Sequence, residues 1–104
     1  MPDTFDFTTS DILDWELDLI QNALDRQQIE ITDHAFEAAQ EDNIPPVALL
    51  EAILIGVAVS KDLPDNQLQR VPGINFEHCL KDGRWIRVKV AWINNYAIIT
   101  VYKI

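Results

Sequence analysis

His34 is the side chain in this sequence best suited to acid–base chemistry, because imidazole titrates near neutral pH and can both accept and donate a proton. RNA cleavage needs such a group, together with a second proton-transfer residue and cations that stabilise the charge at phosphorus. Tyr102 is the candidate for the second proton-transfer residue, and Arg87 is the candidate for the cation. The alternative for His34 is a structural side chain at a helix start, bonded to the backbone or to Glu30. The alternative for Tyr102 is a sheet residue with its hydroxyl at the rim.

Basic residues in the second half of the chain could bind a phosphate backbone. Trp85, Arg87 and Lys89 occupy every second position of an expected strand, so their side chains share one face. Single-stranded nucleic acids bind to surfaces that combine cations with aromatic rings for stacking. The net charge of −9 opposes this, since charge dominates nonspecific affinity for phosphates. A solvated sheet face is the alternative. The candidates for contact with nucleic acid are Arg70, Arg84, Arg87 and Lys89.

Potential metal ligands are too few at any one place to predict a metal site. His34 and Glu37 are three residues apart, and His78 precedes Cys79, but neither pair supplies the ligands that zinc requires. The sequence also lacks a glycine-rich phosphate loop, a Gly-x-Ser-x-Gly motif and a second cysteine. We therefore expect no metal and no cofactor, and we expect Cys79 to face the core.

Charge is distributed unevenly along the 104 residues. Residues 1–51 hold 13 acidic side chains and one basic side chain, a net −12, whereas residues 52–104 hold four acidic and seven basic side chains, a net +3. The length fits one domain, and the single cysteine excludes an internal disulfide. The longest apolar run is interrupted by Glu51 and Gly56, short of the roughly 18 residues of a membrane span. We expect a cytoplasmic protein that does not enter a membrane.

Three helices are expected in the first half of the chain. Apolar residues at helical spacing, with acidic residues between them, predict an amphipathic helix over 11–27 that begins after the hydroxyl residues 8–10. A second helix is expected from residue 32 or 33 to residue 42, where Asn43 favours a stop. A third, over 47–55, is apolar nearly all round and is expected to be largely buried.

Strands and tight turns follow. Residues 81–83 and 94–95 carry Asp-Gly and Asn-Asn pairs that are typical of hairpin turns. We expect an α+β fold, in which the helices are followed by an antiparallel β-meander sheet packed on them. The whole of 1–104 is expected to form a single domain, with a tail over 1–9, an acidic helical segment over 10–28 and a core over 29–104. The expected strands are 29–31, 57–59, 74–80, 84–93 and 96–103.

Two motifs in residues 29–104 carry a resemblance to a known family. The helix start Thr32-x-His34-Ala35 and the closing Ile-Thr-Val-Tyr at 99–102 resemble the bacterial family catalogued as domain of unknown function 4258, which is similar to the BrnT and RelE-like ribonuclease toxins. The resemblance implies a meander sheet flanked by helices. In the toxin relatives it implies an RNA-cleaving surface made of basic side chains and a histidine, which His34 and Tyr102 would match.

This chain departs from the family pattern at two positions. The family usually has arginines four and eight residues after the histidine, where this chain has Ala38 and Asp42. We therefore expect a degenerate, non-catalytic member that binds a protein partner or self-associates through an open edge of its sheet. The alternative is a metal-independent endoribonuclease of a toxin–antitoxin system that uses His34 and the basic residues of the sheet. Three roles are open for the acidic helix. It keeps the protein soluble, it lies over the basic sheet face as an antitoxin segment would, or it offers an acidic surface to a partner.

Overall fold

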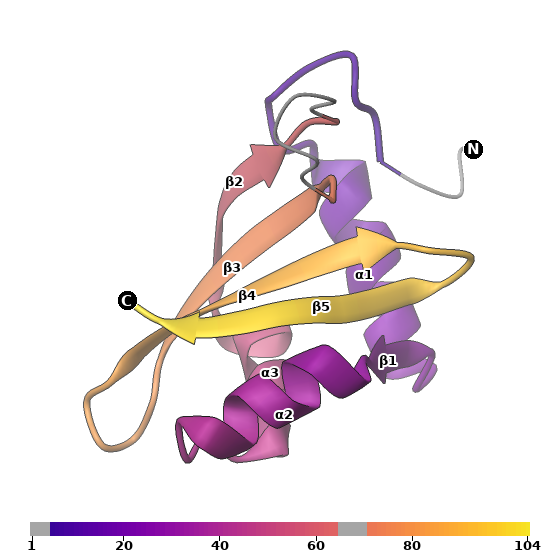
Figure 1. Ribbon diagram of the computed structural model, residues 1–104. Helices are drawn as coiled ribbons and strands as arrows, with labels where there is room; N and C mark the ends of the chain where they lie inside the picture. The colour runs from indigo at the N-terminus through magenta and orange to yellow at the C-terminus, as the bar shows by residue number, and fades with distance from the viewer. Residues whose placement is uncertain (1–4, 65–70) are drawn as a thin grey trace.

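The computed structural model describes residues 5–64 and 71–104 and has one sheet with helices packed against it (Figure 1). The elements follow the order expected from the sequence: α1, β1, α2, α3, and then β2 to β5. Their bounds are α1 (Asp14–Asp25), β1 (Ile29–Ile31), α2 (Asp33–Glu41), α3 (Pro46–Ile55), β2 (Val57–Asp62), β3 (Gly73–Cys79), β4 (Trp85–Trp92) and β5 (Tyr96–Lys103).

The strand order in the sheet is β1-β5-β4-β3-β2. Strands β2 to β5 form the expected antiparallel meander, and β1 adds a short parallel pairing to β5, so that the sheet is mixed. The hairpin turns contain Gly83 at φ 92° and Asn94 at φ 79°, the left-handed region that glycine and asparagine tolerate best. The α+β architecture is therefore confirmed, including both predicted turns.

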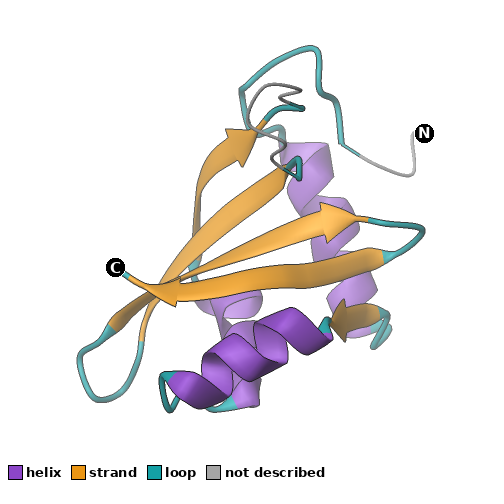
Figure 2. Ribbon diagram, in the orientation of Figure 1, coloured by secondary structure: helices purple, strands orange, loops and turns teal. Residues whose placement is uncertain are grey.

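The helices are divided between one face of the sheet and one of its edges (Figure 2). Helices α1 and α3 lie behind the sheet in this view, whereas α2 runs beside β5. Ile20 of α1 and Leu49 of α3 are buried in the same core as Ile86 and Val88 of β4. Because side chains alternate along a strand, Arg87 of β4 must then lie on the opposite face. We call that face, opposite α1 and α3, the open face.

Helix α1 begins at Asp14, three residues later than expected. The Glu16 carboxylate accepts a hydrogen bond from the Leu13 backbone N–H at 2.8 Å, and so satisfies a donor at the helix start. The hydroxyl of Thr9 instead accepts from the N–H of Asp11 within the preceding turn. A carboxylate inside the first turn thus replaces the hydroxyl cap predicted from residues 8–10.

The segment before α1 is held by a buried ion pair. Lys61 of β2 lies 2.8 Å from Glu16, and both side chains are fully buried. The Lys61 ammonium also donates to the Asp6 carbonyl at 2.8 Å, while Glu16 accepts from the Asp6 N–H at 2.9 Å. Phe5 is buried against Phe7 and Tyr96. From residue 5 onward, the predicted tail is therefore docked on the domain.

Helix α3 is buried on one side, and the prediction that it would be largely buried is wrong for the other side. Leu49 and Ile53 are fully buried against the sheet, but Leu54 is 57% exposed and Ile55 is 65% exposed. A helix on one face of a sheet buries only the side it turns toward the strands. Nothing in 5–64 or 71–104 covers the other side.

Cys79 is exposed rather than core-facing, which corrects a second expectation. Phe76 of β3 points into the core, so strand alternation places Cys79 on the open face, where it pairs in register with Trp85. Across the described ranges, no helix has the length and apolar character needed to cross a membrane.

Candidate functional site

The open face brings together several of the residues that the sequence singled out. Arg87 lies between Glu77 of β3 and Tyr102 of β5 in the strand register. Trp85, two residues earlier on β4, is 52% exposed, and Tyr102 is 44% exposed. Arg87 and Tyr102 are therefore neighbours, as a shared site would require.

The charge of Arg87 is neutralised by its neighbour on β3. Its guanidinium donates to the Glu77 carboxylate through Nε, at 3.0 Å, and through a second, closer contact of the same pair. A third nitrogen donates to the Tyr102 hydroxyl at 3.2 Å. The hydrogen bond to Glu77, followed by that to Tyr102, raises the pKa of Arg87 above its ordinary value. This arginine is bound to a carboxylate rather than available to a phosphate.

Lys89 is also paired. Its ammonium lies 2.6 Å from the Asp62 carboxylate of β2 and donates to the Val71 carbonyl at 3.1 Å. Asn75 donates to the same carboxylate oxygen at 3.0 Å, so the lysine belongs to a small polar network. The second cation predicted to contact nucleic acid is therefore neutralised as well.

Arg84 fastens the end of α2 to the β3–β4 turn. It pairs with Asp82 at 2.8 Å and donates to the carbonyls of Asp42 and Asn43 at 2.6 and 3.0 Å. These carbonyls lie just past the last turn of α2, where a cation also interacts favourably with the helix dipole. Arg84 therefore has a structural role, and the fourth candidate, Arg70, lies outside the described residues.

His34 is exposed near the start of α2. It makes no hydrogen bond or ion pair with any residue in the described part of the chain, so neither the catalytic grouping nor the expected bond to Glu30 is formed there. The adjacent Thr32 holds this end of α2, because its hydroxyl accepts from the Ala35 N–H at 3.3 Å and donates to the Ile98 carbonyl at 3.0 Å. The Thr-x-His-Ala motif thus caps α2 and attaches it to β5.

The two positions that depart from the family pattern also have structural roles. Ala38 packs against the core. Asp42 lies 3.6 Å from Lys103, and its carbonyl accepts from Arg84. Arginines at these positions would add positive charge to α2, whereas here the helix carries the opposite charge.

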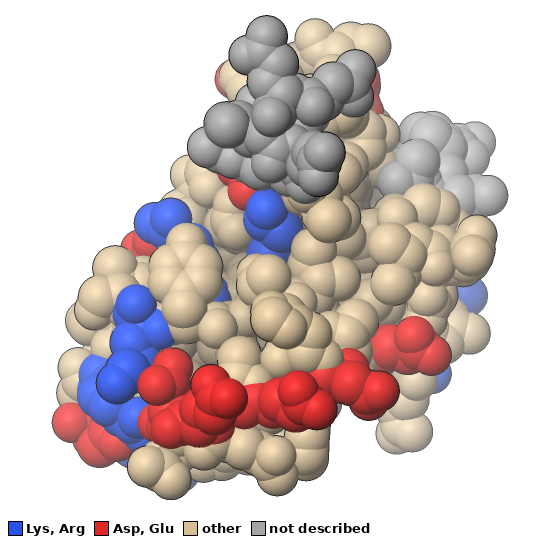
Figure 3. Space-filling view, viewed as in Figure 1, with Lys and Arg blue, Asp and Glu red and all other residues tan. Residues whose placement is uncertain are grey.

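The exposed side of α2 is acidic. Asp33, Glu37 and Glu41 follow one another at four-residue spacing and are all exposed. Figure 3 shows this acidic band running along α2 beside the open face. We call these three residues the α2 acidic band. Their mutual repulsion opposes helix formation slightly, and their field repels a polyanion.

Helix α1 does not cover the basic residues of the sheet. Its buried residues Ile20 and Ala23 belong to the core behind the sheet, whereas Asp14 and Asp18 point to solvent on that side. The pairing with Glu77 and Asp62 on neighbouring strands, rather than an acidic helix, neutralises the open-face cations.

No group of three or more His, Cys, Asp or Glu side chains within the described residues is arranged to hold a metal ion. His78, one of the ligand candidates, lies 3.6 Å from the Glu51 carboxylate of α3. Of the other candidates, His34 and Glu37 lie on α2 and Cys79 lies on β3.

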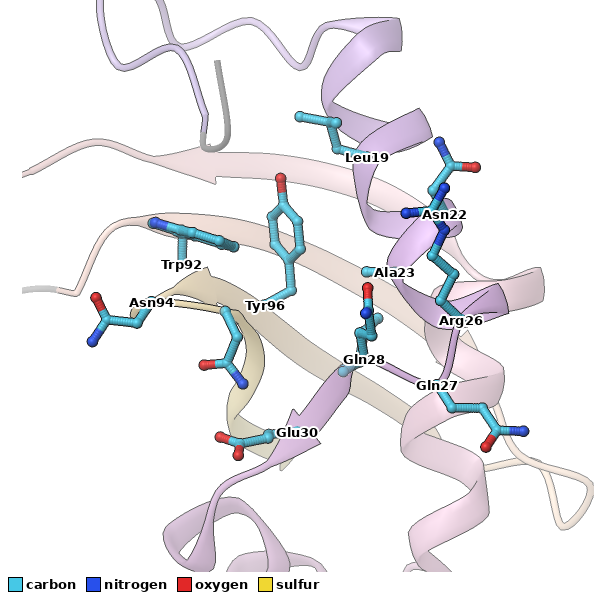
Figure 4. Close-up of a pocket in the computed structure, with 12 residues that line it drawn as sticks. Leu19, Asn22, Ala23, Arg26, Gln27, Gln28, Glu30, Trp92, Asn94 and Tyr96 are labelled. Carbon is cyan, nitrogen blue, oxygen red and sulfur yellow. The ribbon is translucent and has the colours of Figure 1, made fainter. Parts of the chain in front are cut away.

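A cavity of about 770 Å³, which was not predicted from the sequence, lies at the opposite end of the sheet from Arg84 (Figure 4). It is formed by the C-terminal end of α1, by β1 and by the β4–β5 turn. The paired amides Gln27-Gln28 and Asn94-Asn95 were its only signal in the sequence. Its lining consists of Leu19, Asn22, Ala23, Arg26, Gln27, Gln28, Ile29, Glu30, Trp92, Asn94, Asn95 and Tyr96.

Comparisons of the chain with protein-family models, with curated proteins and with solved structures find no match. The resemblance to domain of unknown function 4258 therefore remains a prediction from the two motifs.

Proposed function

We propose that this protein is a non-catalytic binding domain, a degenerate relative of the BrnT and RelE-like toxins, whose open face docks a protein partner. The observation that carries the proposal is the pairing of Arg87 with Glu77 and of Lys89 with Asp62. A ribonuclease needs uncompensated cations near its proton-transfer group. Here those cations are held by carboxylates, and His34 has no hydrogen-bonding partner in the described chain.

The remaining open-face surface has the composition of a protein interface. Trp, Tyr and Arg are the residues that most often dominate binding energy at interfaces, and Trp85, Tyr102 and Arg87 are adjacent here. Val57 is in register with Glu77 and extends the apolar area to the edge of the sheet. An ion pair that is already formed costs less to cover than an isolated charge.

The α2 acidic band specifies the charge of the partner. A protein segment that covers Trp85 and Tyr102 and reaches α2 would meet carboxylates with exposed heads. Lysines or arginines on that segment would steer the encounter and fix its orientation. We therefore propose a partner that combines apolar anchors with flanking basic residues.

Photo-crosslinking in cells tests the docking surface. A photoreactive phenylalanine analogue at position 85 is expected to give a discrete protein adduct that is lost when Tyr102→Ala is added. The same analogue at Asp18, an exposed position on α1 behind the sheet, is the matched control and is expected to give none. Equal labelling from both positions, or an adduct partner without a basic segment, would contradict the proposal.

Ribonuclease activity is the second candidate, because Arg87 and Tyr102 do share a hydrogen bond on the open face. We expect purified wild-type protein to leave RNA intact and its expression to leave growth unchanged. RNA cleavage that is lost in His34→Ala, with the fold of the variant preserved by circular dichroism, would establish the ribonuclease and refute the non-catalytic domain.

A further inference from the structure

The cavity at the end of α1 has two walls with different chemistry. Figure 4 shows Trp92 and Tyr96 on the sheet side, facing Asn22 and Arg26 of α1. Gln28 lies between them on the chain that leads into β1. A volume of about 770 Å³ is within the range of small-molecule sites, roughly 300 to 1,000 Å³.

Carboxamide side chains are concentrated at this cavity. Five of the chain's twelve Asn and Gln residues line it, although it is formed by only 12 residues. None of the five side chains hydrogen-bonds to another residue of 5–64 or 71–104. Each therefore has free donors and acceptors. The five are Asn22, Gln27, Gln28, Asn94 and Asn95.

The lining has no net formal charge. Arg26 and Glu30 are its one cation and its one anion. Phosphate sites in proteins instead bring several basic groups or backbone N–H groups together. A lining of this kind favours a neutral ligand over a nucleotide.

Aromatic and aliphatic side chains provide an apolar surface. The rings of Trp92 and Tyr96 meet edge to face, with centroids 4.9 Å apart. Leu19, Ala23 and Ile29 complete this part of the lining. A ligand that fits must therefore have an apolar face as well as hydrogen-bonding groups.

We propose that this cavity binds a neutral ligand of the saccharide class. A sugar hydroxyl donates and accepts a hydrogen bond at once, as a carboxamide does. The C–H faces of a sugar ring supply the apolar surface that packs against an indole or phenol ring. An extended peptide fits less well, because β1, the strand at the cavity, has only three residues along which to form backbone hydrogen bonds.

Two-dimensional NMR with neutral sugars tests the site. Uniformly ¹⁵N-labelled full-length protein is titrated with a panel of neutral mono- and disaccharides, and the indole N–H signals report on the three tryptophans. We expect saturable shifts of the Trp92 indole and of the Asn22 and Gln28 side-chain amides, with Trp85 unchanged. Binding of single sugars is expected in the millimolar range.

A matched pair of variants identifies the hydrogen-bonding groups. Asn22→Leu combined with Gln28→Met keeps side-chain volume and removes two carboxamides from the cavity, and it is expected to weaken binding at least tenfold. Gln40→Met, an exposed change on α2, is the control and is expected to bind as the wild type does. Absence of saturable shifts with the whole panel would overturn the proposal, as would stronger binding of a nucleoside phosphate or a peptide at the same residues.

Discussion

Arg84 connects two parts of the chain that are more than 40 residues apart. Its guanidinium binds the carbonyls of Asp42 and Asn43 at the end of α2 and the Asp82 carboxylate in the β3–β4 turn. Its backbone N–H also donates to Asp82 at 3.1 Å. A basic residue that the sequence places among the nucleic-acid candidates thus fixes the position of a helix.

The Asp82 carboxyl is expected to titrate below its ordinary pKa of 3.8, chiefly because of the backbone hydrogen bond from Arg84 and less because of the guanidinium. A lowered pKa in the folded state stabilises the fold at pH values above the unfolded pKa, and this contribution is lost as the pH falls through the folded pKa. NMR titration of the side-chain carboxyl measures it. In Arg84→Ala the pKa is expected to stay low, since the backbone N–H remains; a return to the ordinary value would show that the side chain dominates.

At the scale of elements, the ion pair between Glu16 and Lys61 joins α1, β2 and the segment that begins at Phe5. Each charged group also has backbone partners, so that the pair is fully hydrogen-bonded although it is buried. The amphipathic pattern of α1 predicts the helix, but it does not distinguish Glu16 from the exposed acidic residues of the same helix. Only the packing shows that this one is inside.

Lys61→Met is expected to destabilise the protein by about 3–5 kcal/mol, because it leaves the Glu16 carboxylate buried without its cation. The double variant Glu16→Gln/Lys61→Met removes both charges and is expected to recover part of this loss. Urea denaturation followed by circular dichroism measures both free energies of unfolding. A double variant that is less stable than Lys61→Met alone would show that hydrogen bonds, rather than the unpaired charge, account for the loss.

At the scale of the whole molecule, the two-part charge pattern of the sequence does not become a molecule with one acidic and one basic face. The acidic half forms α1, behind the sheet, and α2, along its edge, whereas the basic residues of β4 pair with Glu77 and Asp62 within the sheet. Local pairing therefore neutralises the open face although the second half of the chain is basic.

Two double variants that each raise the net charge by two units test this arrangement. Glu77→Gln/Asp62→Asn frees Arg87 and Lys89 on the open face and is expected to create salt-sensitive RNA binding. Asp14→Asn/Asp18→Asn, on α1, is expected to leave RNA binding at the wild-type level because these residues lie behind the sheet. Fluorescence anisotropy with a labelled oligouridine measures both. Equal gains would mean that total charge, and not its location, controls binding.

The sequence by itself determined the α+β architecture, the order of the elements and both hairpin turns, because periodicity and turn chemistry are local properties. Asn43 at φ 54° ends α2 as predicted, and Arg87 and Tyr102 are brought together by strand register. The exposed side of α3 and the exposure of Cys79 were mispredicted, since apolar residues do not show which side a neighbouring element will cover.

Only the tertiary structure decided whether the candidate cations were free. Glu77 is ten residues from Arg87 and Asp62 is 27 residues from Lys89, and nothing in their local sequence predicts these pairs. The same holds for the cavity, whose carboxamides come from α1, the α1–β1 turn and the β4–β5 turn. Ion pairs and cavities arise where distant segments meet, so their chemistry depends on packing rather than on spacing along the chain.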